Sequence, residues 1–505
     1  MPKPNIRGAI ITSTKPHKSF SKRVIESGLW VFSLKALQHI FNFARLIILA
    51  RILSPNDFGL IGIALLTLAT LETFSYTGFQ AALIQKKDDI KQYLDSVWTF
   101  LIVRGIALFI IVYLIAPHIA IFFETSEARL IIRIVGLSFL IGGFTNIGVV
   151  FFQKKLEFNK EFKYQLAATI TDFIVSVVTV LILRNVWALV LGLLAGKTVR
   201  CVTSYLFHPY RPHLHFSLRK VQELFDFGKW IFVSSILVFL ITQGDDAFVG
   251  KVLGTTALGF YQLAYKISNI PATEISHVIA RVTFPAYSII RDNILNLRES
   301  YLRTLQVTVF LSLPVTGLTF VLAPDFTKVF LGEKWMPMVP TMQMLTLFGM
   351  LRAIGATTGA VFMAVGKPEA RTRIQFGQLV LLTLIIYPLS MRWGILGTSM
   401  AVTAYALIFN TVAVHKVFKI IESNSKGMVK LFMIPLIGTS LAILSVFGVK
   451  VSLFASISLA SFLALITVGM IVYILAIHFF YIIFDYEDDY IVHKQIIMML
   501  GLKNK

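Results

Sequence analysis

Apolar stretches of roughly twenty residues recur from one end of the chain to the other. At ~1.5 Å per residue, a helix of that length crosses the ~30 Å hydrocarbon core of a bilayer. Only 14% of the 505 residues are charged and 56% are hydrophobic, and the mean hydropathy is +0.77. A water-soluble fold of this composition would leave too much apolar surface in water, so the sequence predicts a bundle of membrane-spanning helices.

The fold class that we expect is an all-α polytopic membrane protein with about fourteen transmembrane helices. An outer-membrane barrel is excluded because runs such as Ile106–Ala116 lack the alternation of its strands. The expected spans cover residues 24–50, 58–84, 96–116, 130–152, 164–183, 186–207, 225–250, 257–289, 304–323, 340–366, 374–391, 394–415, 431–449 and 453–484.

The formal net charge of +21 would fit a nucleic-acid partner, but the distribution of the charges indicates another role. Lys and Arg concentrate in alternate loops, whereas each intervening loop carries one or two of them. This alternation follows the positive-inside rule and predicts that both termini are cytoplasmic. The basic loops therefore face membrane lipids, and we expect no nucleic-acid partner. They comprise residues 1–23, 85–95, 153–163, 208–229, 290–303, 367–373, 416–430 and 485–505.

The chain also repeats itself at an offset of 200 residues without a gap. Matching pairs at this offset include Gly28 and Gly228, Trp30 and Trp230, Arg51 and Lys251, Gly59 and Gly259, and Ala64 and Ala264. Both repeats begin in the cytoplasm, so we expect two pseudo-symmetric six-helix bundles, plus two C-terminal helices, around a central cavity that opens alternately to each side. The expected divisions are a basic N-terminus (1–23), an N-terminal bundle (24–207), a linker (208–224), a C-terminal bundle (225–418), two appended helices (430–484) and a tail (485–505).

Three segments resemble a known family: ARILSPNDFGLIG from residue 50, LGTTALGFYQLAYKI from residue 253 and FPAYSIIRDN from residue 284. They are similar to the polysaccharide transporters, or Wzx-type oligosaccharide flippases, of the multidrug/oligosaccharidyl-lipid/polysaccharide exporter superfamily, including the lipopolysaccharide and colanic acid exporters. The resemblance implies two six-helix bundles with two extra helices. It also implies translocation of undecaprenyl diphosphate-linked repeat units for lipopolysaccharide, capsule or exopolysaccharide synthesis, but it assigns no site residues.

Ionisable residues inside the spans are the candidate site. Inserting a charged side chain at the centre of a membrane helix costs about 2.5–3.5 kcal/mol, so such residues are expected to have a function. Basic residues outnumber acidic ones in the spans, which favours a diphosphate or an acidic sugar over an organic cation. The substrate-binding candidates are Lys35, His39, Arg45, Arg104, Lys266, His277 and Arg281. The candidates for ion coupling or counter-charge are Glu72, Asp172, Asp245, Asp246 and Glu274. The alternative for any one of them is a structural ion pair.

Helical periodicity places several of these residues on shared faces. Lys266, Glu274, His277 and Arg281 fall on one face of span 257–289, and Lys35, His39 and Arg45 on one face of span 24–50. The offset of the repeat aligns Arg45 with Asp245, so we expect these two to pair. Pro271 and Pro314 each remove a backbone donor within a span, which makes them hinge candidates, with a static bend as the alternative.

Several other functions are disfavoured. The short outer loops offer no paired acidic motif for a membrane glycosyltransferase or polymerase, and no Gly-rich phosphate loop followed by Lys is present. We therefore expect no enzyme activity and no cofactor. The single Cys201 and the scattered His residues predict no metal site. A multidrug or cation antiporter and a lipid II flippase of the same superfamily remain as alternatives. The expected partners are the lipid-linked oligosaccharide, a coupling H⁺ or Na⁺, and polysaccharide polymerase or export machinery.

Overall fold

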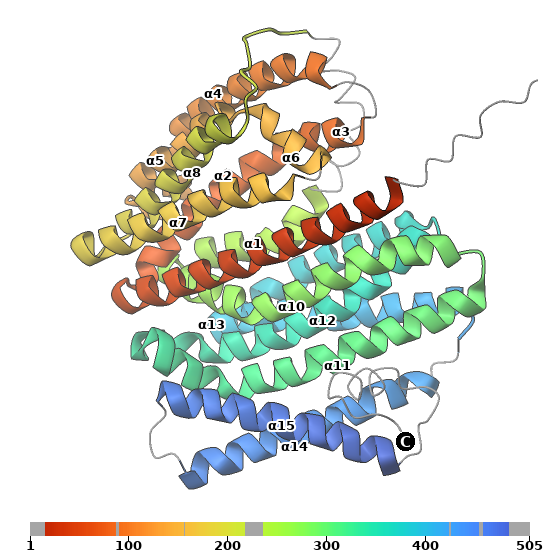
Figure 1. Cartoon of the computed structure of the whole chain (residues 1–505). Coiled ribbons are helices and arrows are strands. Elements are labelled where there is room, and N and C mark those ends of the chain that lie inside the picture. Colours follow the sequence, from red (N-terminus) through yellow and green to blue (C-terminus); the bar gives the residue numbers. More distant parts are fainter. Residues whose placement is uncertain are drawn as a thin grey trace, which may run out of the picture. The chain divides into compact units, whose positions relative to one another are not determined.

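The computed structural model describes residues 16–86, 90–155, 157–217, 236–423, 426–453 and 458–483. Within these ranges every regular element is a helix (Figure 1), which confirms the predicted helical class. The chain forms two compact units. Unit 1 comprises residues 1–49, 75–116 and 130–232, and unit 2 comprises residues 50–74, 117–129 and 233–505.

Unit 1 is built from long helices, with shorter elements between them. One break is a 70° bend between Ala128–Gly143 and Ile147–Lys154. There the Asn146 side chain accepts a hydrogen bond from the Gly148 amide and caps the short turn that follows. The helices that lie wholly or mainly in unit 1 are α1 (Pro16–Ile52), α3 (Phe79–Gln85), α4 (Lys91–Phe122), α5 (Ala128–Gly143), η1 (Ile147–Val149), α6 (Val150–Lys154), α7 (Phe158–Leu183) and α8 (Trp187–Phe207).

Unit 2 is a second bundle, in which one helix of the first repeat packs among helices of the second. Helix α10 lies against α2 and α12, α12 packs on α13, and α11 packs on α14. The elements are α2 (Pro55–Phe74), the helical segment 236–252, α10 (Thr255–Ile290), α11 (Ile294–Phe326), η2 (Thr327–Leu331), η3 (Glu333–Met338), α12 (Val339–Ala364), α13 (Pro368–Ile420), α14 (Lys426–Leu453) and α15 (Leu459–Ile483).

Ten helices in the described ranges are long and apolar enough to cross a membrane, or up to eleven if the bent pair in unit 1 is one span. The chain is therefore a multi-pass membrane protein, while the number fourteen stays a prediction. Helix α13 has 53 residues and would be about 80 Å long if straight, far more than one span requires. Gly394 interrupts it with non-helical dihedrals (φ 58°, ψ −137°), at the predicted boundary between spans 374–391 and 394–415.

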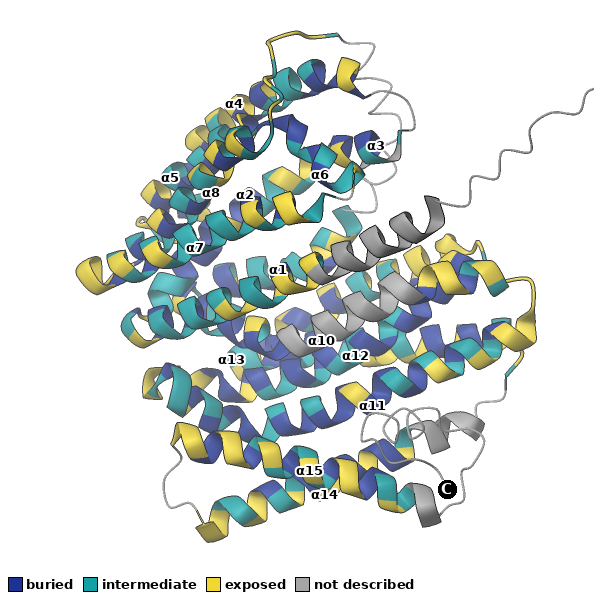
Figure 2. Ribbon diagram, viewed as in Figure 1, coloured by how far each residue is buried: buried dark blue, intermediate teal, exposed yellow. Residues whose placement is uncertain are grey.

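The appended helices α14 and α15 are anchored to α11 by polar as well as apolar contacts. The Tyr473 hydroxyl donates a 2.8 Å hydrogen bond to the Phe310 carbonyl, and the Lys450 ammonium lies 2.7 Å from the Asp325 carboxylate. Exposed residues alternate with buried ones along α14 and α15 (Figure 2), and Leu444 of α14 is 65% exposed. Exposed apolar side chains of this kind are expected where a helix faces lipid.

Candidate functional site

A stripe of polar side chains runs along α7, in the middle of an otherwise apolar helix. Gln165, Thr169, Asp172 and Ser176 are spaced by four, three and four residues, so they lie on one helical face. An ionisable group in such a helix is costly unless it meets a partner or water. The stripe therefore marks the face of α7 on which a polar partner is required.

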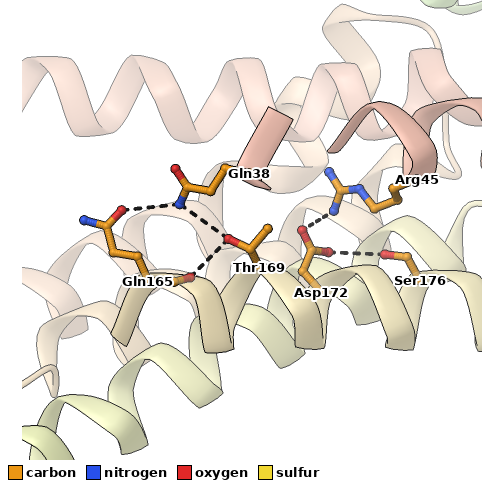
Figure 3. A network of polar contacts seen from close by, with 6 residues as sticks. All are labelled: Gln38, Arg45, Gln165, Thr169, Asp172 and Ser176. Atoms are coloured by element: carbon orange, nitrogen blue, oxygen red, sulfur yellow. Dashed lines mark hydrogen bonds and ion pairs between the residues drawn. The ribbon is translucent and has the colours of Figure 1, made fainter. Parts of the chain in front are cut away.

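Helix α1 supplies that partner (Figure 3). The Gln38 amide lies 3.4 Å from both the Gln165 side-chain oxygen and the Thr169 hydroxyl. About two turns further along α1, the Arg45 guanidinium forms an ion pair with the Asp172 carboxylate. The second Asp172 oxygen accepts a 3.2 Å hydrogen bond from the Ser176 hydroxyl. The network thus gives the two charges partners, whereas an unpaired charge in hydrocarbon would be unfavourable.

Helix α8 approaches the same face of α7 through two glycines that are four residues apart. A Cβ at Gly192 would overlap the Ser176 hydroxyl, and one at Gly196 would lie 2.9 Å from the Asp172 Cβ. Small residues at this spacing let transmembrane helices pack with their backbones close together. The glycines therefore determine how closely α8 packs beside Asp172.

A cavity of about 260 Å³ lies among these three helices, within unit 1. Arg200 reaches it from α8 and donates a 3.1 Å hydrogen bond to the Tyr164 hydroxyl. Because Arg45 balances the charge of Asp172, the two cations of α8 leave the lining with an excess of positive charge. The lining residues are Gln38, Gln165, Ala168, Thr169, Asp172, Leu193, Gly196, Lys197 and Arg200.

This set of side chains can bind an anionic, hydroxyl-rich group. Amide and hydroxyl side chains both donate to and accept from sugar hydroxyls, whereas Lys and Arg donate to phosphate or carboxylate oxygens. One guanidinium has five N–H donors, so Arg200 can hold the Tyr164 hydroxyl and a ligand oxygen at the same time. The cavity is slightly smaller than typical ligand pockets, which span ~300–1,000 Å³, so it fits a part of a large substrate.

A second polar group lies in unit 2, where two carboxylates adjacent in sequence are buried and half-buried, respectively. Asp245 is 2% exposed, and one of its oxygens accepts a 2.6 Å hydrogen bond from the Tyr261 hydroxyl. Its other oxygen has no hydrogen-bond partner among the described residues. Asp246 accepts a 3.0 Å hydrogen bond from the Gln262 amide. Buried carboxylates of this kind are stabilised by binding a proton or a cation.

The remaining predicted site residues are distributed over both units. Arg104, on α4, donates hydrogen bonds of 3.2 and 2.8 Å to the Ser75 hydroxyl. Pro314 is buried inside α11. Four candidates are exposed on their helices: Lys35, His39, Glu72 and Lys266. Four others fall within 270–282, whose side chains lie outside the described residues: Pro271, Glu274, His277 and Arg281.

The structure corrects the predicted partner of Arg45. Arg45 pairs with Asp172 of its own unit, whereas Asp245, the expected partner, accepts its hydrogen bond from Tyr261. The offset of 200 residues identifies equivalent positions in two repeats, but equivalent positions need not touch. Asp172 is one of the residues predicted for ion coupling or counter-charge, and in the structure it is the ion-pair partner of Arg45.

The residues predicted for the site did not include the uncharged Gln165, Thr169 and Ser176, nor the charged Lys197 and Arg200. The spacing of Gln165, Thr169 and Ser176 around Asp172 is a visible sequence signal of a polar helical face. The pair Gly192 and Gly196 is likewise a visible helix-packing motif. The contact of Gln38 with α7 has no such signal, because it depends on which helix packs there.

Comparison with known proteins gives consistent relatives. The model of a family described as polysaccharide biosynthesis protein matches residues 48–340. The lipopolysaccharide biosynthesis protein WzxC of Escherichia coli (strain K12) is 28% identical over 78% of this chain and 80% of its own length. The teichuronic acid biosynthesis protein TuaB of Bacillus subtilis (strain 168) is 26% identical over 74% of this chain and 78% of its own length.

Among solved structures, the lipid II flippase MurJ in an inward closed conformation superimposes with a TM-score of 0.74 at 15% identity. It covers 90% of this chain and 99% of its own. An inward-facing multidrug transporter of the MATE family has a TM-score of 0.62 at 15% identity, over 77% of this chain and 96% of its own. At this level of identity the likeness concerns the fold alone.

Proposed function

Because the chain belongs to the polysaccharide biosynthesis protein family, we propose that it flips undecaprenyl diphosphate-linked oligosaccharide units across the bacterial inner membrane by alternating access. The family membership confirms the resemblance read from the sequence motifs, and the match over residues 48–340 is the observation that carries the proposal. In this proposal both termini are cytoplasmic, and the units supply lipopolysaccharide, capsule or exopolysaccharide synthesis together with a polymerase and export machinery.

The cavity of unit 1 supports this function through its chemistry. A diphosphate or an acidic sugar needs cationic donors, and the glycan hydroxyls need neutral polar partners. Lys197 and Arg200 supply the first, and Gln38, Gln165 and Thr169 supply the second. An organic cation would meet an excess of like charge here, which disfavours the antiporter alternative.

Deleting the gene should cause a lipid-linked oligosaccharide to accumulate in the cytoplasmic leaflet. Synthesis of that intermediate continues, while the step that carries it across the membrane is missing. The measurement is chemical analysis of extracted polyprenyl-linked glycans, compared with a strain complemented by the wild-type gene. Accumulated lipid II would identify the lipid II flippase alternative, and increased retention of a cationic drug with normal glycan levels would favour the antiporter.

Asp245 and Asp246 are the proposed coupling site for H⁺ or Na⁺. Neither carboxylate has an ion-pair partner within the part of the chain that the structure describes, and one Asp245 oxygen lacks any hydrogen-bond partner there. A buried anion without a counter-charge is unfavourable, so binding a cation offsets that cost. Moving each charge through the membrane field is worth ~2.3 kcal/mol per 100 mV, which can drive transport.

Replacing Asp245 with Asn should remove the dependence of transport on the ion gradient. The amide keeps the shape of the side chain and can accept the hydrogen bond from Tyr261, but it cannot bind a proton or a cation as a carboxylate does. The measurement is flipping in proteoliposomes with and without an imposed H⁺ or Na⁺ gradient. Tyr261→Phe is the control, since it removes the hydrogen bond and keeps the carboxylate. An unchanged gradient response in Asp245→Asn would rule out this coupling site.

A further inference from the structure

Two helices of unit 2 cross where their backbones touch, at positions that are equivalent in the two sequence repeats. A Cβ at Gly59 of α2 would overlap the carbonyl oxygen of Thr255, and a Cβ at Gly259 of α10 would overlap the carbonyl oxygen of Pro55. The contact is reciprocal, because each glycine meets the first residue of the other helix. No side chain can be accommodated at either position without moving a backbone.

The same equivalence extends along the crossing. The Asn56 and Thr256 side-chain oxygens lie 3.5 Å apart, 200 residues apart in sequence. One turn further, a Cβ at Gly62 would overlap the side-chain amide of Gln262. Residues that share a position in the two repeats therefore face each other along this crossing, which leaves no room for a substrate between α2 and α10.

Polar contacts between loops surround the crossing. The Thr125 and Thr255 hydroxyls are 2.7 Å apart, and the Lys251 ammonium lies 2.8 Å from the Glu124 carboxylate. The hydrogen bond and positive charge of Lys251 lower the pKa of Glu124, so the pair persists until the pH falls below the usual range of a carboxyl group. This pair is largely solvent-exposed and contributes little to stability, which suits a contact that must open.

A buried aromatic group seals the crossing on another side. Trp335 of η3 is 0% exposed. Its ring lies edge-on to those of Phe58 and Phe260, from the first turn of α2 and the second turn of α10. Close by, Arg51 donates a 2.8 Å hydrogen bond to the Phe330 carbonyl, and the Lys334 ammonium donates one of 2.8 Å to the Arg51 carbonyl. The crossing is thus closed by packing at its centre and by hydrogen bonds around it.

We propose that this interlock is the extracytoplasmic gate of the transporter, closed in this structure, and that release of the substrate requires α2 and α10 to separate at Gly59 and Gly259. The inference rests on the proposed function, because a gate needs a transported substrate. The loops that form it, around residues 51, 124, 251 and 334, all belong to the set with few Lys and Arg, which the charge pattern places outside. A glycan cannot pass between backbones in direct contact, so transport and this closure exclude each other at any one time.

A reversible cross-link tests the gate. In a Cys201→Ser background, Thr125→Cys and Thr255→Cys would replace two hydroxyl oxygens that are 2.7 Å apart with sulfur atoms that can form a disulfide. Oxidation should reduce flipping in proteoliposomes at least tenfold, and a reductant should restore it. Two kinds of control undergo the same oxidation: each single Cys variant, and a Ser458→Cys/Ser461→Cys pair whose native hydroxyls are 3.2 Å apart away from the crossing.

Transport by the oxidised Thr125/Thr255 pair at the rate of the single variants would overturn the gate. If the Cys201→Ser parent shows no flipping at all, the proposed function fails instead, and labelling then decides the gate. Thr255→Cys should react several-fold faster with a membrane-impermeant maleimide added outside when Gly259→Val forces the crossing apart. An unchanged labelling rate, or reaction from the cytoplasmic side alone, would overturn the proposal.

Discussion

Arg45→Ala and Asp172→Asn should each lower the rate of flipping at least about tenfold, which corresponds to a loss of ~1.4 kcal/mol. Each substitution leaves one member of the pair without its partner, in a place where the side chains are only 20% and 22% exposed. Removing one partner of a fully buried pair costs about 3–5 kcal/mol. Partial exposure reduces that cost here, because water can solvate the remaining charge.

The double variant Arg45→Ala/Asp172→Ala separates a structural pair from a binding residue. Without either charge, the cost of an unpaired ion disappears, so expression and thermal stability should return toward wild type. Flipping should stay low, because the Asp172 carboxylate that lines the cavity is absent, together with the guanidinium that pairs with it. Arg392→Ala is the matched control, since it removes an exposed Arg elsewhere. Recovery of flipping in the double variant would assign the pair a purely structural role.

Trp335→Ala should cause the largest loss of stability among single substitutions in unit 2. The indole is 0% exposed, and its nitrogen donates a 2.8 Å hydrogen bond to the Ala50 carbonyl. Truncating a buried aromatic side chain to Ala typically costs 3–5 kcal/mol, because it leaves a cavity that the surroundings fill only partly. We expect the melting temperature in detergent to fall by several degrees, as measured by loss of the monodisperse peak after heating.

Two further variants make the Trp335 prediction specific. Trp335→Phe keeps most of the ring contacts with Phe58 and Phe260 but leaves the Ala50 carbonyl without its donor. This variant should therefore lose about 1 kcal/mol of the free energy of unfolding. Trp393→Ala is the control, because that ring is 44% exposed and its removal creates no buried cavity. Equal melting temperatures for Trp335→Ala and Trp393→Ala would contradict the role of Trp335 in sealing the crossing.

Part of the candidate site could be predicted from the sequence, and the rest depends on how the helices pack. Asp172 and Arg45 were identified because a charge in an apolar helix is costly wherever it lies. The polar face of α7 and the glycine pair of α8 carry periodic signals that a wider search would find. The partner of each face has no local signal, because residues 127 positions apart meet only if α1 packs against α7 in one particular rotation.

The sequence by itself determined the class of the protein. Each helix must by itself be long and apolar enough to cross the bilayer, and both properties can be read from the local sequence. It also determined the family through its motifs, and it placed a helix boundary at Gly394. Only the tertiary structure decided that Arg45 pairs with Asp172 and that Trp335 lies between Phe58 and Phe260. These contacts depend on how helices rotate and pack against one another. Several packings can satisfy the same pattern of apolar residues, and the whole set of side chains selects among them.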